Sequence, residues 1–449
     1  MTACMHRPPA EREQDVPQAY LQLESEGEWV DAWWTAFGDP QLDALIEKAL
    51  QGNLTLEQAD ARLRQAEALA AQVGAARIPS VTGEADASST TRERSSSQGS
   101  TDSYRLGLAA SYEVDLWGRV SSSIQAADQS MVSTAYDLQT ASLSVAAQTA
   151  AAYYTWQYYV ALQELLQDQL DARKKILSVV EARFHTAQAS ATDVLQQRER
   201  VAGAEADLFP VKASLQSAAF SLSVLVGEAP QQDLKLVPKP FPGLPARPPL
   251  GVPADLLSRR PDIQAAWARL ASADWDVNAA KANRLPTLRL TGGAAYENSS
   301  LDEIFDSWVA NLAAGLTAPL IDGGRLKAEV ALAQAFADER FAAYRQSVLD
   351  ALTEVEDALQ LEQRQQDYVE AVERQLAASS LATQAVYNRY VRGQNTFFEA
   401  LVQSTAQQDL EVVVLQAHFE LLGDRIQLYR ALGGDWDFIL QTYRETNDE

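Results

Sequence analysis

Two segments of this chain change abruptly from the pattern of a β-strand to that of a very long helix. From Tyr104 to Leu116, apolar side chains occupy every second position, and small or polar residues lie between them. A period of two predicts a strand with one apolar and one polar face. The same pattern recurs from Trp308 to Leu320, and it is again followed by a helical pattern. Each strand must therefore be joined to its helix by a tight turn.

Glycine is present at both turns, and it adopts backbone conformations that other residues avoid. We therefore interpret the residues at the two strand–helix junctions as structural: Trp117, Gly118, Arg119, Gly323, Gly324 and Arg325. The reverse change, from helix to strand, is expected at Pro79 and Pro286, because proline cannot continue a helix. In a membrane β-barrel, which such alternating strands can form, the aromatic residues of the strands are expected to face lipid: Tyr104, Tyr112, Tyr296 and Trp308.

The two halves of the chain match each other at a nearly constant spacing. Arg284-Leu285-Pro286 follows Arg77-Ile78-Pro79 by 207 residues, and Leu432-Gly433 follows Val226-Gly227 by 206. A register kept over this length indicates a duplicated unit. Each unit is predicted to contain a helix, a β-hairpin, a long helix, a tip and a returning helix.

The duplication divides the chain into five predicted parts. They are an N-terminal arm (1–39), a first repeat (40–227, hairpin 80–117), a proline-rich connector (228–260), a second repeat (261–433, hairpin 287–321) and a C-terminal tail (434–449). The first helix is predicted to start at Asp39 and Pro40 and to continue to about Arg77. The long helix from 120 to 182 would measure about 90 Å.

Composition limits the possible functions. A net charge of −24 argues against nucleic acid or an anionic membrane surface as partner. No run of eighteen apolar residues occurs, so no transmembrane helix is predicted, whereas alternating barrel strands give only a weak hydropathy signal. The three His are scattered, without a catalytic or metal-binding pattern, so we expect neither an enzyme nor a cofactor or metal site.

The single cysteine, Cys4, follows small residues, as does the modified cysteine of a bacterial lipoprotein. The apolar segment that should precede such a cysteine is missing from the sequence. On these residues alone, lipidation of Cys4 and a chance match are both open.

The predicted strands are long enough to cross a bilayer when tilted. Two hairpins give four strands, whereas single-chain barrels have about eight or more. An open edge in lipid leaves backbone groups unpaired at a cost of several kcal/mol each, by the order of magnitude for buried polar groups. Copies of the chain are therefore expected to pool their strands. Two protomers would make eight strands and three would make twelve.

Motifs spread over most of the chain resemble those of the outer-membrane factor family, the channels of tripartite efflux pumps, and especially its lipoprotein branch. They are Trp33–Leu42, Tyr112–Arg119, Arg259–Ile263, Pro319–Arg325 and Leu428–Trp436. The resemblance implies an α+β membrane protein: a homotrimer with a twelve-stranded outer-membrane β-barrel, continued by a periplasmic α-helical barrel. It also implies lipidation of Cys4.

The resemblance further implies a constriction at the helix tips. Phe398, Glu399 and Val402 match ring-forming positions, Arg392 is expected to act in the gate or in adaptor binding, and Asp193 occupies the equivalent first-repeat tip. Three copies of Glu399 would disfavour anions. Leu and Asp are common in the family where Phe398 and Val402 stand, so a more apolar gate is expected. Each residue also has a plainer interpretation: helix packing for Phe398 and Val402, a helix start for Glu399, a cap with Thr192 for Asp193, and exposed surface for Arg392.

The function that follows from the resemblance is a passive exit duct for drugs or other small molecules. It would be closed at its periplasmic tips and would open when a periplasmic adaptor protein and an inner-membrane transporter of the RND type engage it. Two alternatives are open: the outer-membrane channel of a type I secretion system, and a soluble coiled-coil scaffold with the hairpins as surface ribbons.

Overall fold

The computed structural model describes residues 32–94, 97–230, 234–250 and 253–433, so Cys4 and the C-terminal tail lie outside the described residues. The chain forms two compact units. Among the described residues, unit 1 is built from those within 61–136 and 262–347, and unit 2 from those within 32–60, 137–261 and 348–433. Both units draw on both halves of the sequence, so the compact units do not coincide with the predicted repeats.

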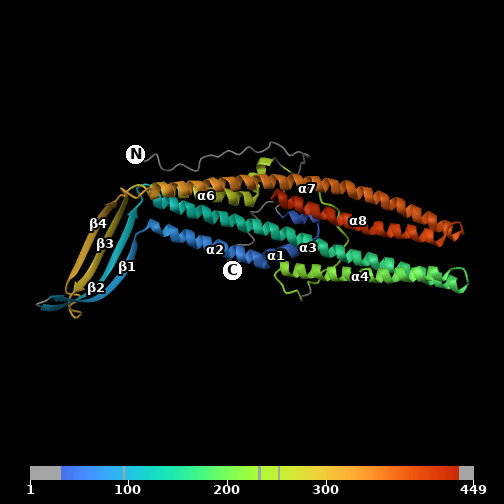
Figure 1. The fold of residues 1–449 in the computed structure, drawn as a ribbon, viewed down its shortest axis with the longest axis horizontal. Helices are drawn as coiled ribbons and strands as arrows, with labels where there is room; N and C mark the ends of the chain where they lie inside the picture. Colours follow the sequence, from blue (N-terminus) through green and yellow to red (C-terminus); the bar gives the residue numbers. More distant parts are fainter. Residues whose placement is uncertain (1–31, 95–96, 231–233, 251–252, 434–449) are drawn as a thin grey trace. The chain divides into compact units, whose positions relative to one another are not determined.

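Unit 1 contains a four-stranded antiparallel sheet in the order β1-β2-β3-β4 (Figure 1). Its strands are β1 (Ser80–Arg94), β2 (Ser97–Val114), β3 (Thr287–Asn298) and β4 (Trp308–Thr317). Strands β2 and β4 end before the junction residues. At Val114 the ladder ends because its carbonyl accepts a turn hydrogen bond from Leu116 N at 2.8 Å.

The register of the strands places apolar side chains on one face of the sheet. Ala85, Leu106, Tyr296 and Trp308 are successive partners across the four strands and therefore share a face. The neighbouring row, on the opposite face, begins with Glu84 and Gly107. That opposite face also carries Asp86, Arg105, Glu113, Arg289 and Glu297. One face therefore suits lipid and the other suits a polar lumen.

Gly107 allows β2 and β3 to approach closely. A Cβ at this position would lie 2.6 Å from the Cβ of Ala295 and 2.9 Å from the carbonyl oxygen of Ala294. Any side chain here would force the two strands apart, and these strands are the seam between the two predicted hairpins.

Helices of unit 1 contact one another through both small and aromatic residues. The unit contains most of α6 (Pro261–Ala282), much of α2 (Leu54–Gly74), and the first turns of α3 (Arg119–His185) and α7 (Arg325–Val391). Ser272 Oγ donates to the Ala126 carbonyl at 2.8 Å, which requires α6 and α3 to lie close together. The rings of Trp267 and Tyr344 meet edge-to-face at 5.3 Å between α6 and α7.

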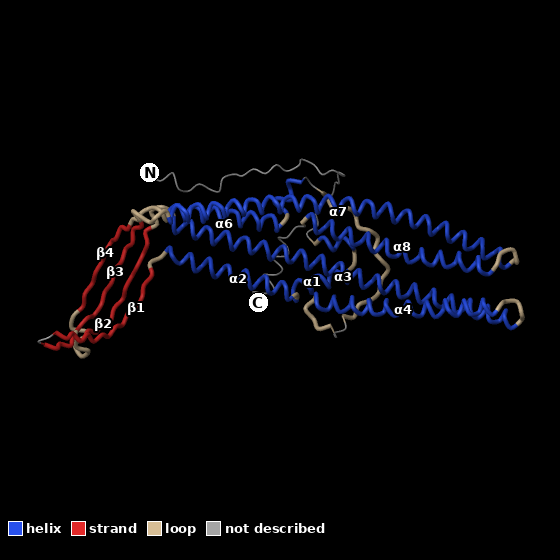
Figure 2. The backbone as a smooth tube through the Cα atoms, in the orientation of Figure 1, coloured by secondary structure: helices blue, strands red, loops and turns tan. Residues whose placement is uncertain are grey.

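Unit 2 is built around two long helical hairpins, α3 with α4 (Ala191–Leu225) and α7 with α8 (Phe397–Leu432) (Figure 2). Helices α3 and α7 have 67 residues each, or about 100 Å at 1.5 Å per residue. Leu170 of α3 packs against Val201 and Leu208 of α4, and Val369 of α7 packs against Ala417 of α8.

Among the described helices, α4 is the one whose length and composition would also suit a membrane span. Some of its apolar residues are used in packing within the chain, because Val201, Ala204 and Leu208 form a packed cluster with Leu170 of α3. Arg198 and Arg200 also lie in its N-terminal half. We therefore interpret α4 as a packing helix.

The first predicted helix starts as expected but is interrupted. Asp39 is the N-cap of α1 (Pro40–Gly52), and its side chain accepts from Gln41 N at 3.0 Å. The prediction of a continuous helix to Arg77 was wrong, because Asn53 separates α1 from α2. The Asn53 side chain accepts from Thr55 N and donates to the Leu225 carbonyl, both at 2.8 Å. One side chain therefore provides hydrogen bonds to backbone groups at both the start of α2 and the end of α4.

An aromatic cluster fills the core of unit 2. The Trp33 ring stacks on Tyr429 at 5.3 Å, and Phe37 packs between Tyr429 and Tyr154. Tyr153 is fully buried, and its hydroxyl donates to Asp39 at 2.6 Å. The segment that begins at Trp33 is therefore anchored to α3 and α8.

The proline-rich connector is fixed to this core at two points. Lys239 Nζ contacts Asp39 at 2.7 Å, and Gln41 exchanges hydrogen bonds with the backbone of Val237. Burial raises the pKa of Asp39, but the hydrogen bonds from Lys239 and Tyr153 outweigh burial and leave that pKa lowered.

At the second point, Glu362 of α7 is fully buried between two guanidinium groups. Arg425 of α8 makes a bidentate contact with it at 2.7 and 2.9 Å, and Arg247 of the connector contacts it at 2.8 Å. Burial raises the pKa of Glu362, but the hydrogen bonds and charge of the two arginines lower it below its usual range.

Candidate functional site at the helix tips

The two helix tips are built on the same backbone motif. Helix α3 is followed by Ala187, whose φ is +61°, and α7 is followed by Gly393, whose φ is +73°. Ala187 N donates to the Phe184 carbonyl at 2.9 Å and Gln188 N to the Arg183 carbonyl at 2.8 Å. The equivalent bonds of the second tip, from Gly393 and Gln394, are both 2.9 Å. This is the Schellman arrangement, in which a left-handed residue ends a helix.

The returning helices also start in the same way. Ser190 caps α4 and Thr396 caps α8, each in a reciprocal capping box. Asp193 accepts from Ser190 N at 2.8 Å, and Glu399 accepts from Thr396 N at 2.9 Å. The expected cap at Thr192 and Asp193 is thus displaced. Ser190 is the cap, and Asp193 is its partner on the first turn.

The carboxylates of Asp193 and Glu399 are therefore held by local backbone geometry. Each lies at a helix N-terminus, where the helix dipole favours negative charge. Glu399 is exposed and Asp193 is partly exposed, so both remain accessible while they cap.

Two apolar side chains beside Glu399 point away from the packed interior of the chain. Phe398 is 60% exposed and Val402 is 47% exposed, whereas Leu401 between them is buried. Phe398 and Val402 are four residues apart and so lie on one face of α8. Arg392 is also exposed, at the C-terminal side of α7. The structure thus brings Phe398, Glu399 and Val402 together on the first turns of one helix, and Asp193 lies on the equivalent turn of α4.

A contact between the two tips was not predicted from the sequence. The Arg183 guanidinium of α3 lies over the Tyr390 ring of α7, with 4.9 Å between the guanidinium carbon and the ring centroid, and it donates to the Tyr390 hydroxyl. Further along, Arg200 of α4 donates to Thr405 Oγ1 of α8 at 2.9 Å. The tips of the two helical hairpins are therefore joined by side chains.

These contacts border a cavity of about 620 Å³ between α3, α7 and α8. Its lining includes Val179, Arg183, Tyr387, Tyr390, Phe397 and Leu401. One signal of this arrangement is visible in the sequence, because Arg183-Phe184 and Arg389-Tyr390 match between the repeats.

The strand–helix junctions are held by a carboxylate in each half. Asp115 accepts from Val120 N and Ser121 N at 3.0 and 2.9 Å, and Asp322 accepts from Gly324 N and Leu326 N at 2.9 Å each. Burial raises the pKa of Asp115, but the hydrogen bonds from Ser121 and Val120 outweigh burial and leave that pKa lowered. The backbone hydrogen bond of Leu326 is the main cause that lowers the pKa of Asp322.

The junction residues themselves fit the structural interpretation. Gly118, Gly323 and Gly324 have φ values of +74°, +64° and +90°. Arg119 forms a bidentate ion pair with Glu113, both contacts at 2.7 Å. Trp117 Nε1 donates to the Pro286 carbonyl at 2.6 Å, so the first junction is tied to a helix–strand switch of the second half.

Comparison with known proteins places this architecture in a family. The family model described as "Outer membrane efflux protein" matches residues 45–228 and 252–434. The pyoverdine export outer membrane protein OpmQ of Pseudomonas putida is 36% identical over 422 residues, which cover 90% of this chain and 88% of that protein. The cation efflux system protein CusC of Escherichia coli is 26% identical over 418 residues, with coverage of 90% and 88%.

Solved structures agree with this result. The outer-membrane channel OprN has a TM-score of 0.90 and 29% identity, and the match covers 96% of this chain and all of that one. The open state of the MtrE outer membrane channel of Neisseria gonorrhoeae has a TM-score of 0.84 and 26% identity, with coverage of 96% and 99%. The expected channel fold and outer-membrane location are confirmed, and a soluble coiled-coil scaffold is excluded. This chain belongs to the outer membrane efflux protein family.

Proposed function

We propose that this chain is the exit duct of a tripartite efflux pump and acts as a homotrimer. The observation that carries the proposal is the open four-stranded sheet, with one apolar and one charged face. Strands β1 and β4 are its edges, and unpaired backbone groups in lipid are too costly to persist. Three copies close these edges into twelve strands, and the face with Arg105 and Glu113 lines the lumen.

The duct passes small molecules passively and has no catalytic step. Its partners are a periplasmic adaptor protein and an inner-membrane transporter of the RND type. The relatives are named for different cargoes, pyoverdine for OpmQ and cations for CusC, so the fold itself accommodates chemically different substrates. Selection of the cargo then belongs to the partners.

The gate of this duct is at the helix tips. In this proposal Phe398 and Val402 form apolar rings in the trimer, which their exposure on a single chain and their shared face of α8 support. Glu399 adds a ring of negative charge beside them, and Asp193 a second one. The Arg183–Tyr390 contact holds the two hairpins of each protomer together in the closed state. Arg392 binds the adaptor in this proposal, which its exposure beside Gly393 supports.

Lipidation of Cys4 anchors the N-terminus in this proposal. The supporting features are the small residues before Cys4 and the family resemblance. Metabolic labelling with an alkyne fatty acid, compared between the wild type and Cys4→Ser, tests it. Equal labelling of the two proteins would remove the anchor from the proposal.

Membrane fractionation with gel migration tests the trimer. The chain is expected in the outer-membrane fraction, and it should migrate as a trimer before boiling and as a monomer afterwards. Recovery as a soluble monomer or dimer would contradict the proposed function.

A further inference from the structure

The apolar face of the sheet is not uniformly covered by side chains. It contains a hollow of about 470 Å³, whose walls include Ala85, Leu106, Leu108, Ala294, Tyr296 and Trp308. The register explains the hollow. Leu106 and Tyr296 are direct partners on one row, and Leu108 and Ala294 are partners on the next row of the same face.

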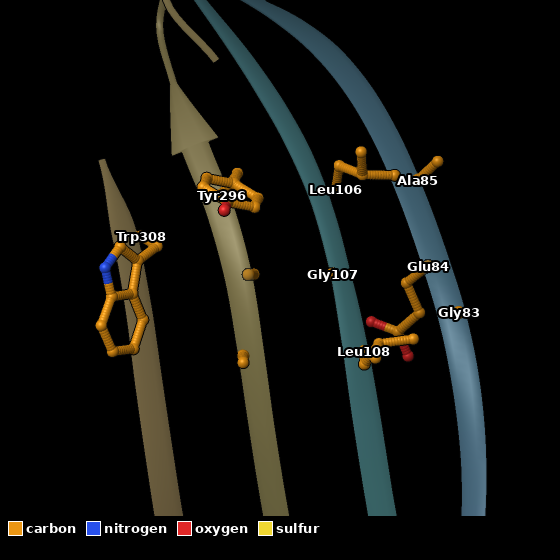
Figure 3. A pocket seen from close by; sticks show the side chains of 10 residues that line it. Gly83, Glu84, Ala85, Leu106, Gly107, Leu108, Tyr296 and Trp308 are labelled. Carbon is orange, nitrogen blue, oxygen red and sulfur yellow. The ribbon is translucent and has the colours of Figure 1, made fainter. Parts of the chain in front are cut away.

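Figure 3 shows how the hollow stays open. The rings of Tyr296 and Trp308 lie on β3 and β4, and Leu106 leans from β2 toward β1. The backbone around Gly107, between these groups, has no side chain of its own to cover it. Ala294 on the adjacent row is too small to fill the space.

An aromatic contact braces one wall of the hollow, and most residues of the lining are apolar. The Tyr296 ring meets Phe305, from the β3–β4 connection, edge-to-face at 5.3 Å. Glu84 also borders the hollow, although it pairs with Gly107 in the row whose side chains alternate to the opposite face of the sheet. The other polar side-chain atoms of the lining belong to Tyr296 and Trp308, residue types that suit a membrane interface.

The hollow is continuous with the face that contacts the bilayer. In that position its occupant is an acyl chain, since it lies among Leu106, Leu108 and Ala294 in the hydrocarbon region. Tyr296 lies eight residues along β3 from Leu288, which at about 3.3 Å per residue and a tilt of about 40° is roughly 20 Å of depth. The apolar band of such a barrel is about 25 Å tall, so the hollow lies in its outer half.

We propose that this hollow is a binding site for one acyl chain of a lipid from the external leaflet, held between Leu106 and Tyr296. The side of the bilayer rests on the proposed orientation of the duct, with its helices in the periplasm. The bound chain fills a gap that no side chain fills, and it supports the β2–β3 seam where the two hairpins of the protomer meet.

Native mass spectrometry of the trimer extracted in mild detergent tests the site. The wild type is expected to retain about one lipid per protomer, and Ala294→Phe, which fills the hollow, should retain several-fold less. Ala110→Phe is the matched control, because Ala110 lies on the same face outside the walls. It should retain as much as the wild type. If Ala294→Phe fails to form a heat-modifiable trimer, Ala294→Leu replaces it.

A wild type without retained lipid, or equal retention by the two phenylalanine variants, would overturn the site. Conductance in planar bilayers separates this result from failure of the duct itself. A conducting trimer without retained lipid would contradict only the proposed lipid site. A chain that forms no conducting trimer would contradict the proposed function.

Photo-crosslinking in intact cells tests the leaflet. A benzophenone amino acid placed at Ala85 beside the hollow is expected to capture the glycolipid of the external leaflet. The same group at Val81, four residues nearer the helix end of β1 and on the same face, should capture phospholipid. Phospholipid adducts at both positions would contradict the assignment to the external leaflet.

Discussion

The Arg183 guanidinium lies 4.9 Å from the centre of the Tyr390 ring and donates to its hydroxyl, which joins the tips of two helical hairpins. The two residues are not equivalent in the duplication. Arg183 corresponds to Arg389, and Tyr390 corresponds to Phe184. Phe184 has no hydroxyl to accept a hydrogen bond, so Arg389 cannot make the same bond. The duplicated tips are therefore joined by a one-sided contact.

Removing the Tyr390 hydroxyl should weaken the contact that holds the tips together in the proposed closed state. Tyr390→Phe keeps the ring under Arg183 but removes the hydrogen bond, and a bond to a charged group contributes about 1.5–3 kcal/mol. The equilibrium constant that favours the proposed closed state over the open state should fall by about tenfold or more. Channel openings in planar bilayers should therefore become more frequent. Tyr387→Phe, in the same cavity, is the control. Equal opening frequencies for both variants would show that the Arg183–Tyr390 hydrogen bond does not affect gating.

The backbone at the tips should respond in opposite directions to two small substitutions. Ala187→Gly removes the strain of a left-handed alanine and should stabilise the first tip by about 1 kcal/mol. Gly393→Ala introduces the same strain and should destabilise the second tip by about 1 kcal/mol. Hydrogen exchange at the first tip should slow by about fivefold, and exchange at the second should accelerate by a similar factor. Acceleration at both tips would show that the left-handed geometry does not limit their stability.

Asn53 should be needed for the stability of unit 2. Asn53→Ala leaves the Leu225 carbonyl unpaired and the start of α2 uncapped, at a cost of about 1–3 kcal/mol. The melting temperature of the helices, followed by circular dichroism, should fall. The exposed Asn388→Ala in α7 should leave it unchanged. The same melting temperature for both variants would mean that the hydrogen bonds of Asn53 contribute little to the free energy of unfolding.

Asp424 should make the protein less stable as the pH rises. Burial is the main cause that raises its pKa, with help from Glu362 and Glu420, to about 6. The folded state therefore holds this proton more tightly than the unfolded state, whose ordinary value is 3.8. Stability falls as the pH rises from about 4 to about 6.

Asp424→Asn removes this penalty. The variant should melt at a higher temperature than the wild type at pH 7 and at a similar temperature at pH 4. Asp409→Asn, on an exposed side chain of the same helix, should show no such dependence. A constant difference between Asp424→Asn and the wild type at both pH values would exclude the titration of Asp424 as the cause.

Local patterns in the sequence predicted the main elements because each depends on near neighbours. The period of two from Tyr104 to Leu116 gave a strand, and Asp39 before Pro40 gave a helix start. The four-strand count predicted an assembly, because the hydrogen bonds of the strand edges must be satisfied in lipid.

Features that depend on distant residues could not be predicted in this way. Asn53 interrupts a periodic apolar pattern because the end of α4, more than 170 residues later, needs its amide. Ser190 rather than Thr192 caps α4, since the Schellman turn at Ala187 decides where the next helix begins. The Arg183–Tyr390 contact needs two hairpins to be packed together, and no local pattern specifies their alignment.

The proposed gate at the helix tips is tested most directly by single-channel conductance in planar bilayers. The double variant Phe398→Ala, Val402→Ala removes the two exposed apolar side chains of α8, whereas Phe209→Ala removes an exposed ring of α4 away from the tips. A several-fold rise in conductance is expected for the double variant, and the wild-type value is expected for Phe209→Ala. Wild-type conductance for the double variant, in a properly formed trimer, would contradict a gate at Phe398 and Val402.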